Sequence, residues 1–167
     1  MSDGLDVVPQ EDDPKIGIEA ADRAGIAEGL GEVLADTYKL LFKTHAYHWN
    51  VEGPLFYSLH NLTEEQYEDL FAAADDIAER MRALGKLAPF TMQSLHEHSL
   101  VKDATGTPSA REMVEDLVRD HEAVSKRFTK LSELSDDKHD PTTADLCNGR
   151  GAFHDKAAWM LRAIAAQ

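Results

Sequence analysis

Apolar residues recur at spacings of three and four along most of the chain, which is the period of an amphipathic helix. The first such segment covers about residues 16–50, and its stripe consists of Ile26, Leu30, Val33, Leu34, Leu41 and His45. The stretch from Val51 to Pro54 ends this helix, because Gly and Pro interrupt the helical pattern. A second helix is predicted over about residues 55–84, and Gly85 is a typical glycine just past a helix end.

The connection after the second helix, residues 86–106, contains a short helical pattern around residues 92–98. The third long helix is predicted to start at Thr107 as the cap with Pro108 in the first helical position. Its apolar stripe consists of Met113, Leu117, Val124, Phe128 and Leu131, and His121 lies in a gap of that stripe.

The fourth long helix is predicted to start with Asp140 as the cap and Pro141 in the first helical position. Its stripe consists of Leu146, Phe153, Ala157, Met160, Leu161 and Ile164. No segment of useful length alternates with the period of two that strands show. Four long amphipathic helices therefore predict an all-α four-helix bundle, with a short helix between the second and third long helices.

Composition places the chain among globular proteins. Its 167 residues suit one domain with a sizeable core, and 43% of them are hydrophobic. A single cysteine, Cys147, excludes an internal disulfide framework and suits a reducing compartment. Because the first residues lack the basic and apolar regions of a secretory signal, and no apolar run reaches membrane-spanning length, we expect a cytoplasmic protein without membrane contact.

The chain is strongly acidic, with 31 Asp and Glu against 17 Lys and Arg and a formal net charge of −14. Such a surface repels nucleic acid and anionic lipid and attracts cations, although it also serves solubility alone. Residues 1–15 contain five acids and one lysine. We expect them to form a disordered acidic arm in front of a helical domain at residues 16–167.

The second predicted helix has two apolar faces. One is an ordinary core stripe of Leu59, Leu62, Leu70, Ala73, Ile77, Met81 and Leu84. The other consists of Phe56, Tyr67, Phe71, Ala74 and Ala78, on a different side of the helical wheel. A helix at the surface of a bundle does not need a second apolar face, which therefore predicts a subunit interface. The alternative is a central helix that is buried on two sides within one chain.

Metal-binding side chains lie on or beside the second apolar face. His60 and Glu64 form one pair at (i, i+4), and Asp75 and Glu79 form another. The pairs are fifteen residues apart, about 22 Å along a helix axis, so one chain cannot bring both to one ion. Two antiparallel copies packed on this face can. The alternative is that these are common acid pairs and an ordinary packed histidine.

The ligand types favour a first-row transition metal. Imidazole with carboxylate suits Fe(II) or Zn(II), whereas the lack of thiolate ligands argues against Cu(I) and iron–sulfur clusters. A site with few protein ligands also leaves positions open for water, dioxygen or peroxide.

The segment from Thr44 to Gly85 resembles the ferroxidase segment of the Dps family, the mini-ferritins. Its sequence is THAYHWNVEGPLFYSLHNLTEEQYEDLFAAADDIAERMRALG. The features that match are His48-Trp49-Asn50, Gly53, Phe56, Leu59-His60, an acid four residues later, Asp75, Ala78-Glu79-Arg80 and Leu84-Gly85. A weaker similarity continues into the fourth helix, so the resemblance covers most of residues 20–165.

The resemblance implies a ferritin-like four-helix subunit in a hollow twelve-subunit shell, a dodecamer. It implies iron sites at two-fold interfaces, where Fe(II) is oxidised, preferably by hydrogen peroxide, and stored as ferric mineral, which protects against oxidative damage. One subunit would supply His48, His60 and Glu64, and its neighbour Asp75 and Glu79. These residues and Trp49 would form the catalytic set. In the family such a tryptophan can take up radical equivalents, and packing is its alternative role.

The sequence also departs from the family pattern. Many members have Asp where this chain has Glu64, which puts the spacing of the metal ions in doubt more than their binding. Members that bind DNA often use a lysine-rich tail, whereas this arm is acidic, so we expect weak or absent DNA binding. Asp140 and Asp145 either line a negative iron entry pore or only stabilise the start of the fourth helix.

Three other functions compete with the ferroxidase. A di-iron enzyme with its site inside one bundle needs Glu-x-x-His pairs, and no histidine here has Glu three residues before it. A nucleoid-associated, DNA-protecting shell with little ferroxidase activity would be favoured by a basic arm. A shell that binds Zn(II) without redox turnover stays open.

Overall fold

The computed structural model describes residues 4–166, and within this range the regular secondary structure consists of helices alone. They are the 3-10 helix η1 (Gly4–Asp6) and the α-helices α1 (Ala20–Asn50), α2 (Phe56–Ala83), α3 (Met92–His98), α4 (Ala110–Asp137) and α5 (Pro141–Ala165). The predicted all-α class is confirmed, and so is the short helix between the second and third long helices. Of the predicted arm, residues 1–3 lie outside the described range.

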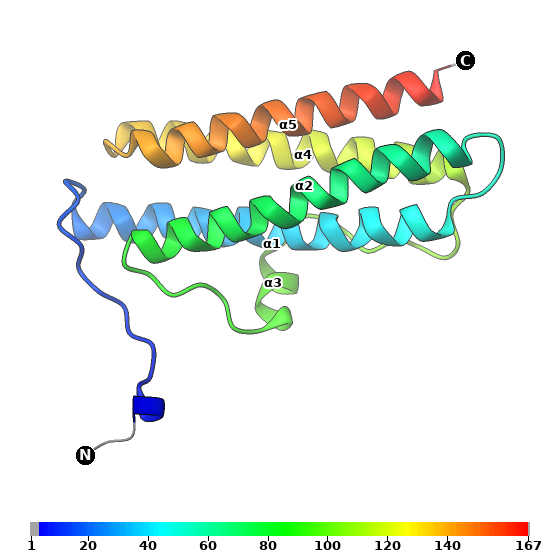
Figure 1. Cartoon of the computed structure of the whole chain (residues 1–167). Coiled ribbons are helices and arrows are strands. Elements are labelled where there is room, and N and C mark those ends of the chain that lie inside the picture. The colour runs from blue at the N-terminus through cyan, green and yellow to red at the C-terminus, as the bar shows by residue number, and fades with distance from the viewer. Residues whose placement is uncertain (1–3, 167) are drawn as a thin grey trace.

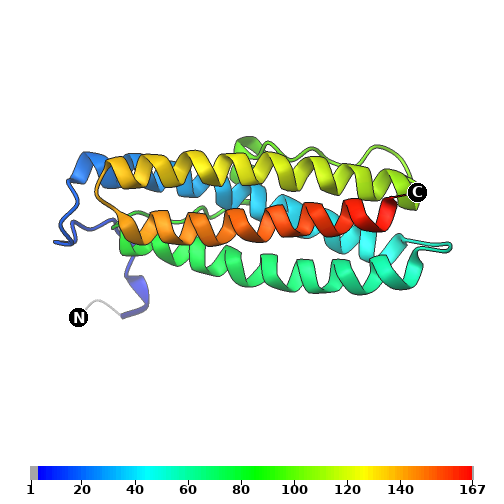
Figure 2. The same ribbon diagram turned by 90° about the horizontal axis from the view of Figure 1, so that it is seen from above.

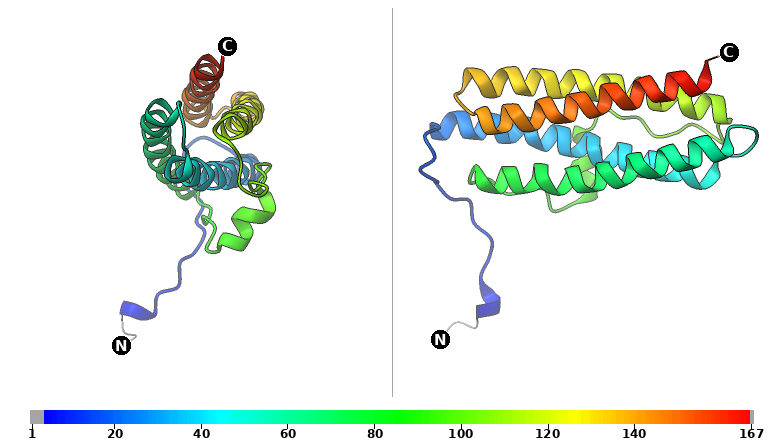
Figure 3. Two further views of the ribbon diagram at one scale, coloured as in Figure 1. Left: turned by 90° about the vertical axis from the view of Figure 1, so that its right-hand side faces the viewer. Right: turned by 45° about the horizontal axis from the view of Figure 1, so that its top comes forward.

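The four long helices form two antiparallel hairpins, α1–α2 and α4–α5 (Figures 1 and 2). The hairpins pack with α1 against α4 and α2 against α5, so each long helix has two neighbours in the bundle. The crossover of residues 84–109 returns along the length of the bundle, which makes α4 parallel to α2. Figure 3 shows α3 outside the four-helix square, and this short helix packs on α1.

Two helix ends lie where the sequence predicted them. Gly85 follows α2 with a φ of 86°, in the left-handed region that side chains disfavour. Asp140 caps α5, its carboxylate accepts a hydrogen bond from the backbone N–H of Thr143 at 3.0 Å, and Pro141 begins the helix. Both positions are therefore confirmed, because the local chemistry of cap, proline and glycine decides them.

The start of the third long helix was predicted wrongly. Ser109, not Thr107, is the cap of α4. The hydroxyl of Ser109 accepts from the N–H of Glu112 at 3.3 Å, and the Glu112 carboxylate accepts from the N–H of Ser109 at 2.7 Å. This reciprocal capping box satisfies two backbone donors, more than a lone Thr107 hydroxyl can do, so the helix starts two residues later than expected.

The first helix also begins later than predicted, at Ala20 instead of about residue 16. Gly17 has a φ of 84°, which bends the chain in front of the helix. The side chain of Arg23 then donates a hydrogen bond to the carbonyl of Ile18 at 2.5 Å. An apolar period continues through this bend, so spacing alone did not locate it.

The predicted apolar stripes make up the core. Each long helix contributes side chains with no measurable exposure, among them Leu30, Leu70, Phe128 and Leu161. At an order of magnitude, each such side chain contributes about 1.5–3 kcal/mol by leaving water. In the part of the chain that the structure describes, no helix is long and apolar enough to cross a membrane.

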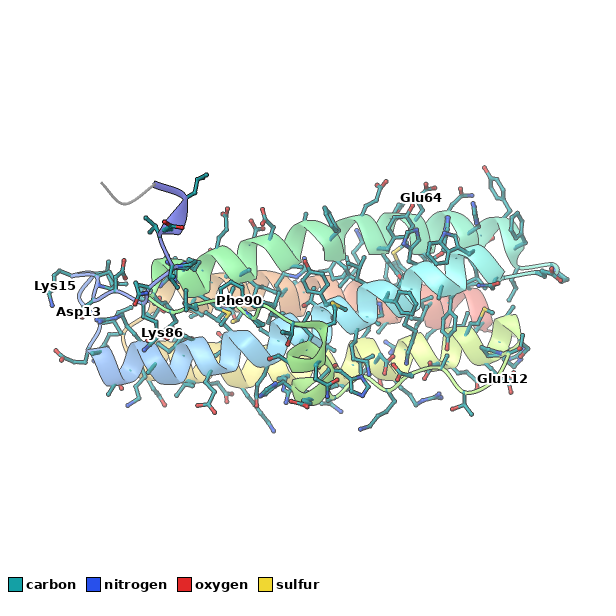
Figure 4. The ribbon with its side chains drawn as sticks, turned by 90° about the horizontal axis from the view of Figure 1, so that it is seen from below. Asp13, Lys15, Glu64, Lys86, Phe90 and Glu112 are labelled. Carbon is teal, nitrogen blue, oxygen red and sulfur yellow. The ribbon has the colours of Figure 1, made fainter. Side chains whose placement is uncertain are left out.

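The segment before α1 packs on one end of the bundle. The N–H of Asp12 donates to the carbonyl of Gly85 at 3.0 Å, and Lys86 pairs with Glu11 at 2.7 Å. Arg23, in the first turn of α1, pairs with Asp13. The start of α1 and the residues just after α2 therefore both bind this segment. Figure 4 shows Asp13, Lys15 and Lys86 gathered at that end. The division into a disordered arm and a helical domain stays a prediction.

Candidate metal centre

The two predicted histidine ligands lie face to face near the turn between α1 and α2. The ring centroids of His48 and His60 are 3.8 Å apart, with an angle of 18° between the rings. The Nδ1 of His48 donates to the carbonyl of His60 at 2.8 Å, and the Nδ1 of His60 donates to the carbonyl of His48 at 3.0 Å. His48 lies in the last turn of α1, where carbonyls lack helical partners.

These hydrogen bonds determine where the proton sits on each ring. A carbonyl oxygen can only accept, so the Nδ1 of both His48 and His60 must carry the proton. Of the two neutral tautomers, this hydrogen bonding selects the one in which Nε2 keeps its lone pair, which is the tautomer that a metal ion needs. Metal-binding histidines usually have such a backbone partner on the second nitrogen.

Glu64 follows His60 by one helical turn and is half-buried. Figure 4 shows it on α2, in the half of the bundle nearer the α1–α2 turn. The hydroxyl of Tyr67 lies 3.5 Å from its Oε1. Burial and the negative charges of Glu64 and Glu68 raise the pKa of Tyr67, so this phenol stays protonated at neutral pH and can donate toward Glu64.

Asp75 and Glu79 are exposed on α2 and lie far from the histidines. From His60 to Asp75 the helix rises about 22 Å. Among residues 4–166 no three His, Cys, Asp or Glu side chains converge closely enough to hold a metal ion. One chain thus brings His48 and His60 together, with Glu64 one helical turn after His60, and leaves the other two carboxylates apart. That a second copy supplies them stays a prediction.

Trp49 is 59% exposed, and its ring lies against His45 at 4.0 Å between centroids. His45 in turn stacks on Tyr67 at 4.2 Å, and Tyr67 meets the edge of His48 at 5.2 Å. Trp49 therefore approaches the histidine pair through His45, whose ring centroid also lies 6.1 Å from that of His48. Tyr67 is predicted from the sequence as part of the second apolar face, and its position three residues after Glu64 also puts both side chains on one side of α2.

An exposed apolar groove adjoins these side chains. It has a volume of about 530 Å³ and is lined by Tyr38, Leu41, Phe42, His45, Tyr67, Glu68, Phe71 and Met92. Phe42 and Phe71 are 67% and 66% exposed, and Phe56 beside His60 is 44% exposed. The second apolar face is only partly free, however, because Ala74 is 2% exposed and packs in the core of its own bundle.

Asp140 is a cap and not a pore residue. It is 1% exposed and pairs with Arg80 at 2.7 Å. Burial alone would raise the pKa of Asp140, but the hydrogen bonds from Thr143 and Arg80 outweigh burial and hold it below its ordinary value. Asp145 is exposed, and its role in an entry pore stays a prediction.

Comparisons with known proteins agree with this fold. The model of the ferritin-like domain family matches residues 27–167. A low temperature-induced protein of Nostoc sp. is 42% identical over 151 residues, which cover 89% of this chain and 84% of that protein. DNA protection during starvation protein 2 of Bacillus anthracis is 36% identical, over 85% of this chain and 97% of that protein.

A solved structure extends the comparison to three dimensions. The Dps protein of Vibrio cholerae, described as a member of the ferritin-like diiron-carboxylate superfamily, has a TM-score of 0.85 at 26% identity. The match covers 93% of this chain and 98% of that one. The chain therefore belongs to the ferritin-like family and, within it, to the Dps proteins.

Proposed function

We propose that this protein is a ferroxidase that oxidises Fe(II) with hydrogen peroxide and stores the ferric product inside a dodecameric shell. The observation that carries the proposal is the reciprocal hydrogen bonding of His48 and His60, which leaves two Nε2 lone pairs on adjacent rings. Two imidazoles, with a half-buried carboxylate one helical turn further along α2, fit Fe(II), and the solved relative is described as a member of a diiron-carboxylate superfamily.

The second half of the site comes from a second copy in this proposal. The exposed Phe71 and the groove beside His45 need a cover, and an antiparallel copy of the same face provides one. In a two-fold interface every contact occurs twice, with the two copies exchanged. Asp75 and Glu79 of each copy therefore reach His48 and His60 of the other copy. Each interface then holds two equivalent sites.

The chain's own residues prepare the reaction. The rings of His48 and His60 are fixed by backbone carbonyls, so they bind Fe(II) without reorganising, and Glu64 adds a negative charge. Two Fe(II) ions lose one electron each, and peroxide takes both electrons as its O–O bond breaks. Both oxygen atoms of peroxide are thereby reduced to the oxidation state that they have in water. Hydrolysis of Fe(III) to the mineral releases protons to solvent. Because peroxide receives two electrons at one site, no hydroxyl radical is released.

An anaerobic Fe(II) titration of iron-free protein, followed by a peroxide pulse, tests the activity. We expect ferric absorbance to rise rapidly, with the product eluting together with a large assembly. In a His60→Ala, Asp75→Ala double variant the fast oxidation should disappear while the assembly persists. Asp76→Ala, on the opposite, wet side of α2, is the matched control and should oxidise Fe(II) normally. An unchanged rate in the double variant would refute the site assignment.

Mixing two single variants tests whether the site is shared. His60→Ala and Asp75→Ala subunits are each inactive alone, but a mixed pair rebuilds one intact site out of two. Half of randomly paired subunits are mixed, so about a quarter of the wild-type sites should return after co-refolding. If the mixture assembles but regains no activity, the two residues act within one chain or do not act in the reaction.

A further inference from the structure

Two buried histidines connect α4 and α5 in the middle of the bundle, away from the candidate metal centre. His121 and His154 have no measurable exposure, and their Nδ1 atoms are 2.9 Å apart. Phe128 stacks on His154 at 5.5 Å, and Phe153 meets His121 edge-on at 6.0 Å. The proposed iron chemistry does not use this histidine pair.

The Nδ1 contact requires that one ring donates and the other accepts. In the neutral pair one proton therefore lies between the two Nδ1 atoms, and the accepting ring carries its own proton on Nε2. Within residues 4–166 neither Nε2 has a hydrogen-bond partner. A further proton must therefore go to a buried nitrogen that nothing stabilises. A proton on every nitrogen would also set two N–H groups against each other across the 2.9 Å contact, which removes the hydrogen bond between α4 and α5.

Besides burial, a charged residue of α5 opposes protonation of the pair. Arg150 of α5 lowers the pKa of both histidines by its positive charge, and its own partner is Asp69 of α2, at 2.5 Å. Asp120 precedes His121 and pairs with Lys43 of α1 at 2.6 Å, and Asp155 follows His154 and accepts a hydrogen bond from Ser125 at 2.7 Å. No carboxylate among the described residues hydrogen-bonds to either imidazole.

We propose that the His121–His154 pair is an acid-sensitive latch, which holds the α4–α5 hairpin closed when neutral and opens it on proton uptake. Opening this hairpin loosens the subunit at its centre and so lowers the stability of any assembly built from it. The proposal is independent of the ferroxidase function, because it concerns the iron-free chain.

The direction of the pH effect follows from the two states of the chain. Burial, and then Arg150, lower the pKa of His121 from 6.5 to about 3, and burial lowers the pKa of His154 well below 6.5. Below pH 6.5 the unfolded chain therefore binds more protons than the folded chain, so stability falls as the pH falls toward 3. The unfolding constant rises up to about tenfold per pH unit for each histidine, or about a hundredfold for the pair.

Urea unfolding of iron-free protein between pH 7.5 and 5, at one fixed protein concentration, tests the latch. We expect the unfolding constant of the wild type to rise steeply below pH 6.5, and the rise to be up to about tenfold smaller per pH unit in His154→Gln. His98→Gln is the matched control on an exposed histidine and should keep the wild-type slope. Most carboxylates titrate below this window, so the comparison isolates histidines.

A second measurement needs no variant. In an NMR titration of the folded protein, the imidazole signals of His121 and His154 should stay those of neutral rings at pH 5. Ordinary titration of the buried pair in the folded chain would overturn the proposal. A pH slope in His154→Gln equal to that of the wild type would overturn it equally.

Discussion

Gly85 serves two purposes at one position. Its φ of 86° ends α2, and a Cβ there would come within 2.4 Å of the carbonyl oxygen of Asp12. We expect Gly85→Ala to lower the free energy of unfolding by about 1–2 kcal/mol from the left-handed backbone alone, and to displace residues 10–15 from the bundle. Urea unfolding at pH 7 measures the first effect and limited proteolysis the second.

The control for this substitution is Gly25→Ala, at a helical position where a Cβ meets nothing within 4 Å. This change should stabilise the chain by up to about 1 kcal/mol, because alanine favours a helix. Equal effects of the two substitutions would contradict the role given to Gly85.

Single residues also show where prediction from sequence stops. His48, His60 and Glu64 were predicted as ligands of one site. The structure brings the two histidine rings together at 3.8 Å, and the role of Glu64 stays a prediction. The tautomer of the two histidines was not predictable, since it depends on backbone carbonyls across a helix–helix contact. The pairing of His121 with His154 could not be predicted either. The two residues are thirty-three positions apart, and the register between two helices decides whether they meet.

At the level of elements, the helices were predictable and some of their starts were not. The sequence before α4 contains two possible N-terminal caps. Ser109 with Glu112 forms a stronger cap than Thr107 with Pro108. The crossover connection was predictable only as a long segment. The direction in which it takes the chain depends on how the two hairpins pack, which hydrophobic spacing does not encode.

A buried lysine of α1 pairs with two carboxylates of α4. Lys43 is 5% exposed and pairs with Asp120 at 2.6 Å and Asp116 at 2.9 Å, and Tyr47 donates to Asp116 at 2.7 Å. Lys43→Met removes the buried positive charge that pairs with both carboxylates, and we expect a loss of about 3–5 kcal/mol at pH 7. Urea unfolding measures it.

The loss in Lys43→Met should shrink as the pH falls. Burial already raises the pKa of Asp120 above 3.8 despite its pairing with Lys43. Without the lysine, the folded chain holds a proton on Asp120 at a pH where the unfolded chain does not, so acid favours the folded variant. Lys39→Met is the control, since its partner Asp103 is exposed and such a pair contributes about 0–1 kcal/mol. A loss independent of pH would argue against a charge effect.

For the whole molecule, charge limits the partners. The net charge is −14, and the first fifteen residues hold five acids against one lysine. Although relatives are named for DNA protection, we expect no retardation of duplex DNA in a gel shift at low salt, where phosphate contacts are strongest. A salt-sensitive shift at that ionic strength would show that the assembled shell presents basic surface that the single chain does not reveal.

The long crossover between α2 and α4 also has a consequence for folding kinetics. Each hairpin is built from contacts that are close along the chain, whereas α1 meets α4 and α2 meets α5 only across the crossover of residues 84–109. Local hairpins form quickly, while closing a long loop costs chain entropy before any contact repays it. We therefore expect docking of two preformed hairpins to limit the folding rate, so that shortening the crossover accelerates folding more than strengthening either hairpin.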